Sequence, residues 1–210
     1  SNQDLPEKVH AEFEEGIRQA GRTVGQLFLE DGQIPQAFAY FRMLGEPGPV
    51  VAALEKAQPG PDDDIQPLVD LAYHQGLLPK KGFDWVLQRY GICNAITSLS
   101  GGEVPFDKDA KDYCVKTLIR ALYDELVDRL RAEVQRKQGF ETSAKTVAEL
   151  IAGRDWLFAD DYYHIDLSHL NAVVQMAAQL DPCPEMHLAG ELCAYGKHLS
   201  PRFQFPSTPP

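Results

Sequence analysis

The chain has 210 residues, of which 44% are hydrophobic and 24% are charged, the balance of an ordinary globular protein. Its formal net charge of −11 repels phosphate groups, so we expect neither nucleic acid nor an anionic membrane as a partner. Its apolar runs are too short to span a bilayer.

The N-terminal half reads as a series of helices separated by Gly and Pro breaks. Ser1 stands where an initiator Met would, so we expect a piece of a longer protein. A helix is predicted from Pro6 to the stop at Gly32, and a second one from Pro35 to Gly45. The first helix carries one apolar stripe, which consists of Val9, Phe13, Ile17, Ala20, Val24, Leu27 and Phe28. Shorter helices are expected at 49–57, 65–75, 79–90 and 92–99.

The most regular helical pattern of the chain extends over 105–138 and ends at Gly139. Its last third is strongly charged, so we expect this end to project beyond the core. A short helix is predicted at 146–152. The stretch 153–165 is aromatic and acidic without a helical period, and we interpret it as a packed loop.

Two further helices complete the pattern. Asp166 is placed as the N-cap of one of them, and the other begins near Pro184. No alternating run of β-branched residues predicts a strand. We therefore predict an all-α fold of about eight to ten helices packed as antiparallel pairs. Residues 1–200 are expected to form one helical domain, followed by a Pro-rich tail at 201–210.

A spaced motif lies in the first predicted hairpin. It consists of Val24-Gly25-x-x-Phe28, Ala37-x-x-x-Phe41 and Pro49, with Gly21 at a position where a large residue is usual. The stretch 18–51 resembles one tetratricopeptide repeat. Small residues at Gly25 and Ala37 allow two helices to approach closely. The resemblance implies a superhelix over 5–100 that offers a groove to a protein or peptide, followed by irregular helices over 105–200. The chain otherwise resembles uncharacterised helical bacterial proteins.

One short cluster suggests metal chemistry. Asp161, His164, Asp166 and His169 contain the spacing D-x-x-H twice. On a helix, this spacing places a carboxylate and an imidazole on one face, where both can bind one metal ion. The competing interpretation makes Asp166 a helix cap and packs His164 against Trp156. A metal-binding helical module or metal-dependent enzyme is thus the alternative function.

Aromatic residues gather just before this cluster, at Trp156, Phe158, Tyr162 and Tyr163. Interleaved with acidic residues, they could form the rim of a partner-binding surface. The alternative is a loop that its aromatic side chains pin to the core.

The sequence assigns no catalytic residue, because it contains neither a G-x-S-x-G nucleophile motif nor a phosphate-binding glycine loop. We expect no cofactor. Its four cysteines form no C-x-x-C pair, which favours a reduced, cytoplasmic setting. The expected function is a non-enzymatic protein–protein interaction scaffold with a protein or peptide partner. The negative charge favours basic partners, and the oligomeric state is left open.

Overall fold

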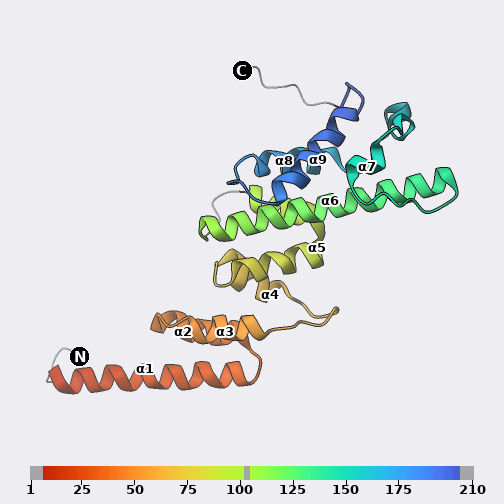
Figure 1. The fold of residues 1–210 in the computed structure, drawn as a ribbon. Helices are drawn as coiled ribbons and strands as arrows, with labels where there is room; N and C mark the ends of the chain where they lie inside the picture. The colour runs from red at the N-terminus through yellow and green to blue at the C-terminus, as the bar shows by residue number, and fades with distance from the viewer. Residues whose placement is uncertain (1–6, 102–104, 204–210) are drawn as a thin grey trace. The chain divides into compact units, whose positions relative to one another are not determined.

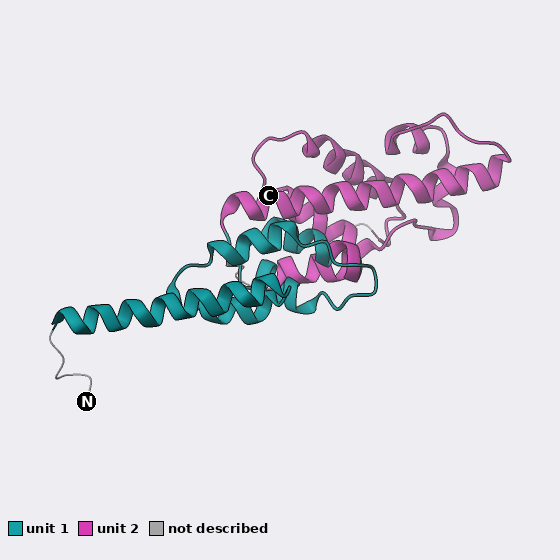
Figure 2. Cartoon of the chain, turned by 90° about the horizontal axis from the view of Figure 1, so that it is seen from below, with its two compact units in different colours: residues 1–86, 104–106 teal, residues 87–103, 107–210 magenta. Residues whose placement is uncertain are grey.

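The computed structural model describes residues 7–101 and 105–203. These residues form helices, turns and loops with no strand among them, so the predicted all-α fold is confirmed (Figure 1). The chain divides into two compact units (Figure 2). Unit 1 contains residues 1–86 and 104–106, and unit 2 contains residues 87–103 and 107–210.

Unit 1 begins with a helical hairpin. Its elements are α1 (Glu7–Glu30), α2 (Ile34–Leu44), α3 (Gly48–Lys56), α4 (Gln66–Val69), the π-helical turn η2 (Asp70–His74) and the first part of α5 (Pro79–Ser100). Both α1 and α2 lie side by side in Figures 1 and 2. Their contacts run in opposite directions along the two helices, because Gly21 of α1 faces Leu44 whereas Phe28 stacks on Tyr40. The pair is therefore antiparallel.

The α1–α2 crossing depends on a missing side chain. A Cβ atom at Gly25 would lie 2.7 Å from the Phe41 ring, closer than packed atoms approach. Ala37 is completely buried, and the rings of Phe28 and Tyr40 stack with their centroids 5.6 Å apart. Small residues thus let the helix backbones approach while aromatic rings fill the space beside them.

The remainder of unit 1 packs around η2 and α5. Tyr73 is 1% exposed and Phe83 is fully buried, and their ring centroids are 5.8 Å apart. A Cβ atom at Gly82 would lie 2.7 Å from the backbone nitrogen of Tyr73, so this crossing also requires glycine. Lys81 Nζ donates hydrogen bonds to two carbonyl oxygens at the end of α3, at 2.6 and 2.8 Å. This ammonium group satisfies backbone acceptors that the end of a helix leaves open.

Unit 2 is built around α6 (Lys108–Gln138), which contacts the three helices that follow it. These helices are α7 (Val147–Ile151), α8 (Leu167–Ala177) and α9 (Glu185–His198), and the 3₁₀ turn η3 (Asp155–Asp161) lies between α7 and α8 in the chain. Leu130 and Val134 are fully buried. The prediction that the charged last third of α6 projects beyond the core is therefore wrong for its apolar side, which is buried.

Several predicted helix boundaries coincide with observed ones. Gly91 has φ 80° and ψ 175° and interrupts α5 where a break was expected. Gly139 ends α6 at φ 78°, as expected, whereas this helix begins at Lys108, three residues after the predicted start at 105. Asp107 caps this start through a 2.9 Å bond from the backbone N–H of Ala110. The expected loop at 153–165 contains the short turn η3. The predicted start at Pro6 and most of the Pro-rich tail lie outside the described residues.

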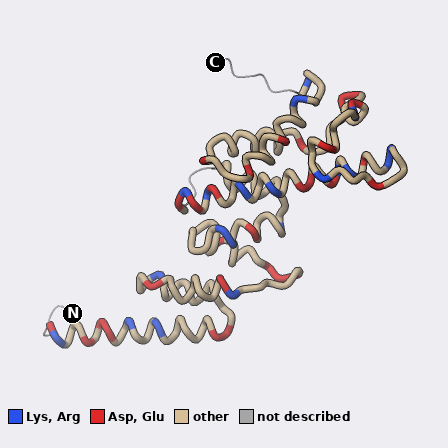
Figure 3. Tube along the Cα trace, viewed as in Figure 1, with Lys and Arg blue, Asp and Glu red and all other residues tan. Residues whose placement is uncertain are grey.

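Charged side chains of both signs alternate along α1 and along the second half of α6 (Figure 3). On α6 they form local pairs, with Arg129 to Glu125 at 2.8 Å and Arg136 to Glu133 at 2.5 Å. None of the helices in the described ranges combines the length and the hydrophobicity that crossing a bilayer requires.

Candidate functional site

The candidate site of unit 2 is the aromatic segment, which we define as residues 155–164. Leu157 within the segment is 1% exposed and Ile165 directly after it is 2% exposed, so both fix the segment to the core. Arg154 precedes the segment, and its Nη1 atom donates to the carbonyl oxygens of Glu149 and Leu150 at 2.9 and 3.0 Å. These contacts hold the start of the segment against the end of α7.

A tight turn shapes the second half of the segment. Asp160 and Asp161 have φ angles of 57° and 59°, a left-handed conformation that is uncommon outside glycine. Arg202 Nη1 donates to Asp161 Oδ2 at 2.8 Å. A hydrogen bond from Ser200 and this guanidinium together lower the pKa of the Asp161 carboxyl. The turn is thus tied to the end of α9 by a charged carboxylate.

His164 is the buried centre of the site and is only 6% exposed. Its backbone N–H donates to Tyr195 Oη at 2.8 Å, and its ring Nδ1 atom lies 3.1 Å from the same oxygen. The Tyr195 hydroxyl carries a single proton, which it can donate to Nδ1. The ring proton of neutral His164 then resides on Nε2, which has no hydrogen-bond partner among the described residues.

Burial determines the ionisation of this pair. It lowers the pKa of His164, although the negative charge of Glu133 partly opposes the shift. Burial also raises the pKa of Tyr195 to about 12. At neutral pH both side chains are therefore uncharged, as a dry site between packed rings requires.

Three aromatic rings surround His164. The centroids of Tyr162, Tyr195 and Phe158 lie 5.1, 5.9 and 6.1 Å from the imidazole. Phe158 also stacks on His198 at 5.4 Å. The sequence-based interpretation paired His164 with Trp156, but these rings are its packing partners in the structure. Phe158 is half-buried, and its ring packs into this cluster.

The other candidate aromatic residues lie further out. Tyr162 is 55% exposed and Tyr163 is 46% exposed. Tyr163 contacts Phe203 edge-on at 5.5 Å. Trp156 is half-buried beneath Lys137, whose Nζ atom lies 6.0 Å from the indole centroid. Of the four predicted partner-binding residues, the two tyrosines present the most surface to solvent.

Negative charge accompanies these tyrosines. Asp155 and Asp160 are exposed, and neither side chain forms a hydrogen bond or ion pair with another described residue. Glu133 differs, because Arg136 pairs with it and lowers the pKa of its carboxyl. The aromatic segment that carries the exposed rings therefore also carries two carboxylates without a cation.

The four residues of the alternative metal site point in different directions. Asp161 binds Arg202, and His164 faces the core. Asp166 caps α8 by accepting from the backbone N–H groups of Ser168 and His169 at 2.7 and 3.4 Å. Across residues 7–101 and 105–203, no three His, Cys, Asp or Glu residues gather as metal ligands would. The structure thus favours the predicted cap and does not assemble the metal site.

Sequence reasoning missed Tyr195 and Lys137. Tyr195 lies 31 residues after His164, and Lys137 belongs to a different helix from the Trp156 that it covers. Their spacing in the chain carries no signal of either contact, because α9 and α6 are brought to the segment by tertiary packing. No protein-family model matches the chain, and no curated protein or solved structure is significantly similar to it.

Proposed function

We propose that this protein is a non-enzymatic interaction scaffold whose unit 2 binds a basic segment of a protein partner at Tyr162 and Tyr163. One observation carries the proposal: two exposed tyrosines project from a segment that is held by a buried His164–Tyr195 pair and that also carries the unpaired Asp155 and Asp160. Monomeric proteins seldom leave neighbouring large aromatic side chains exposed without a use.

The chemistry of the surface indicates the class of partner. Tyrosine supplies a large contact area at a small cost in side-chain entropy, since only two torsions must be fixed. Its ring face attracts Lys and Arg by about 0.5–1 kcal/mol at exposed sites. Asp155 and Asp160 add attraction for the same cations, and the net charge of −11 accelerates the approach of a positively charged chain.

The α1–α2 hairpin supports the scaffold character of unit 1. Its close crossing at Gly25 and Phe41 has the packing that the tetratricopeptide resemblance implies. We extend the proposal to a tetratricopeptide-like superhelix in this unit. The cysteines Cys93, Cys114, Cys183 and Cys193 are all free thiols, which supports a reduced, cytoplasmic setting.

A peptide titration tests this function. Fluorescently labelled Arg/Lys-rich peptides and matched Asp/Glu-rich peptides are titrated with the full chain, and binding is followed by fluorescence anisotropy. We expect saturable binding of basic peptides alone, weakened by about tenfold in the Y162A/Y163A variant because two ring contacts are lost. Raising the salt concentration should weaken binding further, since part of the attraction is between exposed charges.

The matched control is Y90A, which removes a tyrosine that is 39% exposed on α5, outside the aromatic segment. It should bind as the wild type does. Equal affinity for basic and acidic peptides, or equal loss in Y90A and Y162A/Y163A, would contradict the proposed site. Circular dichroism of each variant verifies that the helices remain intact.

A further inference from the structure

An apolar stripe of α1 is exposed along most of the helix. Val9 is 44% exposed, Phe13 is 50% exposed, and Ile17 and Leu27 are each 56% exposed. Ala20 lies between them and is exposed as well. Residues three or four apart share one face of a helix, so these side chains form a continuous surface. Nothing within the described part of unit 1 buries it.

The hairpin partner covers a different part of α1. Contacts with α2 involve Phe28, Gly25 and Gly21, and the last of these lies beside Leu44, the final residue of α2. Residues 7–20 therefore extend beyond the end of α2, as Figures 1 and 2 both show. Almost every residue of this overhang is exposed.

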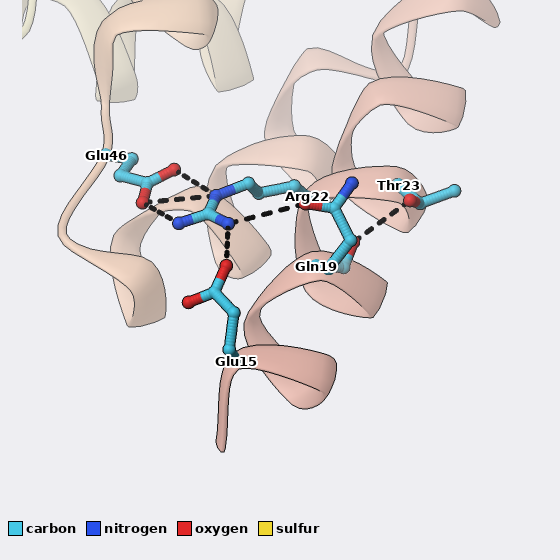
Figure 4. A network of polar contacts seen from close by, with 5 residues as sticks. All are labelled: Glu15, Gln19, Arg22, Thr23 and Glu46. Carbon is cyan, nitrogen blue, oxygen red and sulfur yellow. Dashed lines mark hydrogen bonds and ion pairs between the residues drawn. The ribbon is translucent and has the colours of Figure 1, made fainter. Parts of the chain in front are cut away.

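A polar network fixes the rotation of α1 within unit 1. Arg22 Nη2 donates to Glu46 Oε1 at 2.8 Å, and Nη1 donates to Glu15 Oε1 at 2.9 Å (Figure 4). Hydrogen bonding to this guanidinium lowers the pKa of the Glu46 carboxyl. Arg22 and Glu15 lie two turns apart on one face of α1, and that face is not the one that carries Phe13 and Ile17. The network holds the charged face toward the α2–α3 connection and leaves the apolar stripe toward solvent.

The spacing of the stripe is self-complementary. At its centre, Phe13, Ile17, Ala20 and Val24 are separated by steps of 4, 3 and 4 residues, which read identically in both directions. A second, antiparallel α1 related by a two-fold axis between Arg18 and Gln19 would oppose this set with itself. An interface of this kind uses the same patch on both copies.

Side-chain sizes match in the same register. Phe13 lies opposite Val24 of the other copy, and Ile17 lies opposite Ala20. Each layer pairs a larger side chain with a smaller one, which fills the space between two helices evenly. Residues 7–16 of one copy would then lie beside residues 21–30 of the other, so the overhang gains a neighbour.

Charges also favour the antiparallel arrangement. Glu12 and Glu14 lie opposite Gly25 and Thr23 in this register, whereas a parallel pair would set each glutamate beside its own copy. Like charges at such positions destabilise helix pairs. A negatively charged membrane is a poor alternative occupant, because α1 carries five Glu against three Lys and Arg.

We propose that the apolar stripe of α1 is the interface at which two copies of this chain associate, antiparallel and about a two-fold axis. The dimer buries Phe13 and Ile17 and leaves the Arg22–Glu46 network of each copy in place. The inference goes beyond the proposed peptide-binding function and does not depend on it, since the aromatic segment belongs to the other unit.

Sedimentation equilibrium of the full chain tests the proposal over protein concentrations from about 1 to about 200 μM. Mass action raises the fraction of a reversible dimer as the concentration increases. The mass of the wild type should rise toward twice that of one chain. F13E and I17E should each weaken the dimer by at least about tenfold, because a charge replaces a buried apolar side chain. M43E is the matched control, since Met43 on α2 is 76% exposed and lies outside the stripe.

The register has its own test in the pair Ile17 and Ala20. I17A should weaken the dimer by removing the larger member of two symmetry-related layers. I17A/A20I exchanges the two members and should restore most of the affinity. A monomeric wild type over the whole range, or a dimer that M43E weakens as much as F13E does, would overturn the interface. Failure of A20I to rescue I17A would overturn the antiparallel register. Circular dichroism establishes that each variant retains its helices.

Discussion

The two longest helices, α1 and α6, differ in burial in the opposite sense to the one that their amphipathic patterns suggest. In α1 the apolar and charged faces separate cleanly, yet Gly25 is the one buried residue of that helix, all of which is described. In α6 the charged residues are frequent and the faces are poorly separated. Its buried set nevertheless runs the length of the helix and includes Cys114, Leu118, Leu122, Leu126, Leu130 and Val134.

The difference lies in the number of neighbours. Helices α7, α8 and α9 all pack on α6 and cover apolar residues on several sides of it. The apolar residues of α6 are therefore not confined to one face of the helix. In unit 1, α2 covers the side of α1 that carries Gly21 and Gly25. A strong amphipathic pattern therefore marks a face that can be buried, and it does not say that the same chain buries it.

Truncation of a core leucine gives the largest contrast between these helices. Leu122 is fully buried in α6, so L122A should lower the free energy of unfolding by about 2–5 kcal/mol. I17A on the exposed stripe of α1 should cost less than about 0.5 kcal/mol in dilute, monomeric protein. Urea unfolding followed by Trp156 fluorescence in a W85F background reports on unit 2, and circular dichroism follows I17A. Equal losses would refute the contrast.

The second largest loss of stability is expected from breaking the buried polar contacts of α6. Glu191 is 9% exposed, and its Oε2 atom accepts from Tyr123 Oη at 2.9 Å and from the backbone N–H of Ala148 at 3.1 Å. E191A leaves these donors unpaired and should destabilise unit 2 by about 2–3 kcal/mol. H187A removes only an exposed partner of Glu191 and should change stability by less than about 0.5 kcal/mol. If both variants unfold at the same urea concentration, the network does not stabilise the unit.

Glycine substitutions sharpen the comparison within α1 itself. G25A places a Cβ atom 2.7 Å from the Phe41 ring, and overpacking of this kind costs about 1–3 kcal/mol, offset in part by the better helix propensity of alanine. G16A meets no atom within 4 Å and should stabilise the helix by about 0.5–1 kcal/mol. Thermal unfolding measures both changes. A stabilising G25A would show that the helices do not approach so closely.

Acid should lower the free energy of unfolding of unit 2 through His164. This is the smallest of the four expected changes in stability. The unfolded residue has a pKa near 6.5, and burial lowers the pKa in the folded state. Between these two values the unfolded chain binds a proton that the folded chain excludes. Stability should therefore fall as the pH drops below about 6.5 and level off below the folded pKa. Urea unfolding at a series of pH values, compared between the wild type and H164Q, should show this component only in the wild type.

Local signals predicted most helix ends correctly because they depend on a few adjacent residues. Gly139 and Asp166 act within one turn of the helix that they end or begin. The site was less predictable. The sequence offered its four aromatic candidates either as a partner-binding rim or as anchors to the core, and it gave no indication that Tyr195 holds His164 or that Phe158 packs on Tyr195.

By itself the sequence determined the helical class, the main breaks and the position of the apolar stripe, since each follows from side chains that are close along the chain. Tertiary structure alone decided which apolar faces are covered. It buried Leu130 and Val134 in the charged end of α6 and left Phe13 and Ile17 of α1 exposed. Periodicity specifies what a helix offers, whereas burial depends on which distant segments arrive to pack against it.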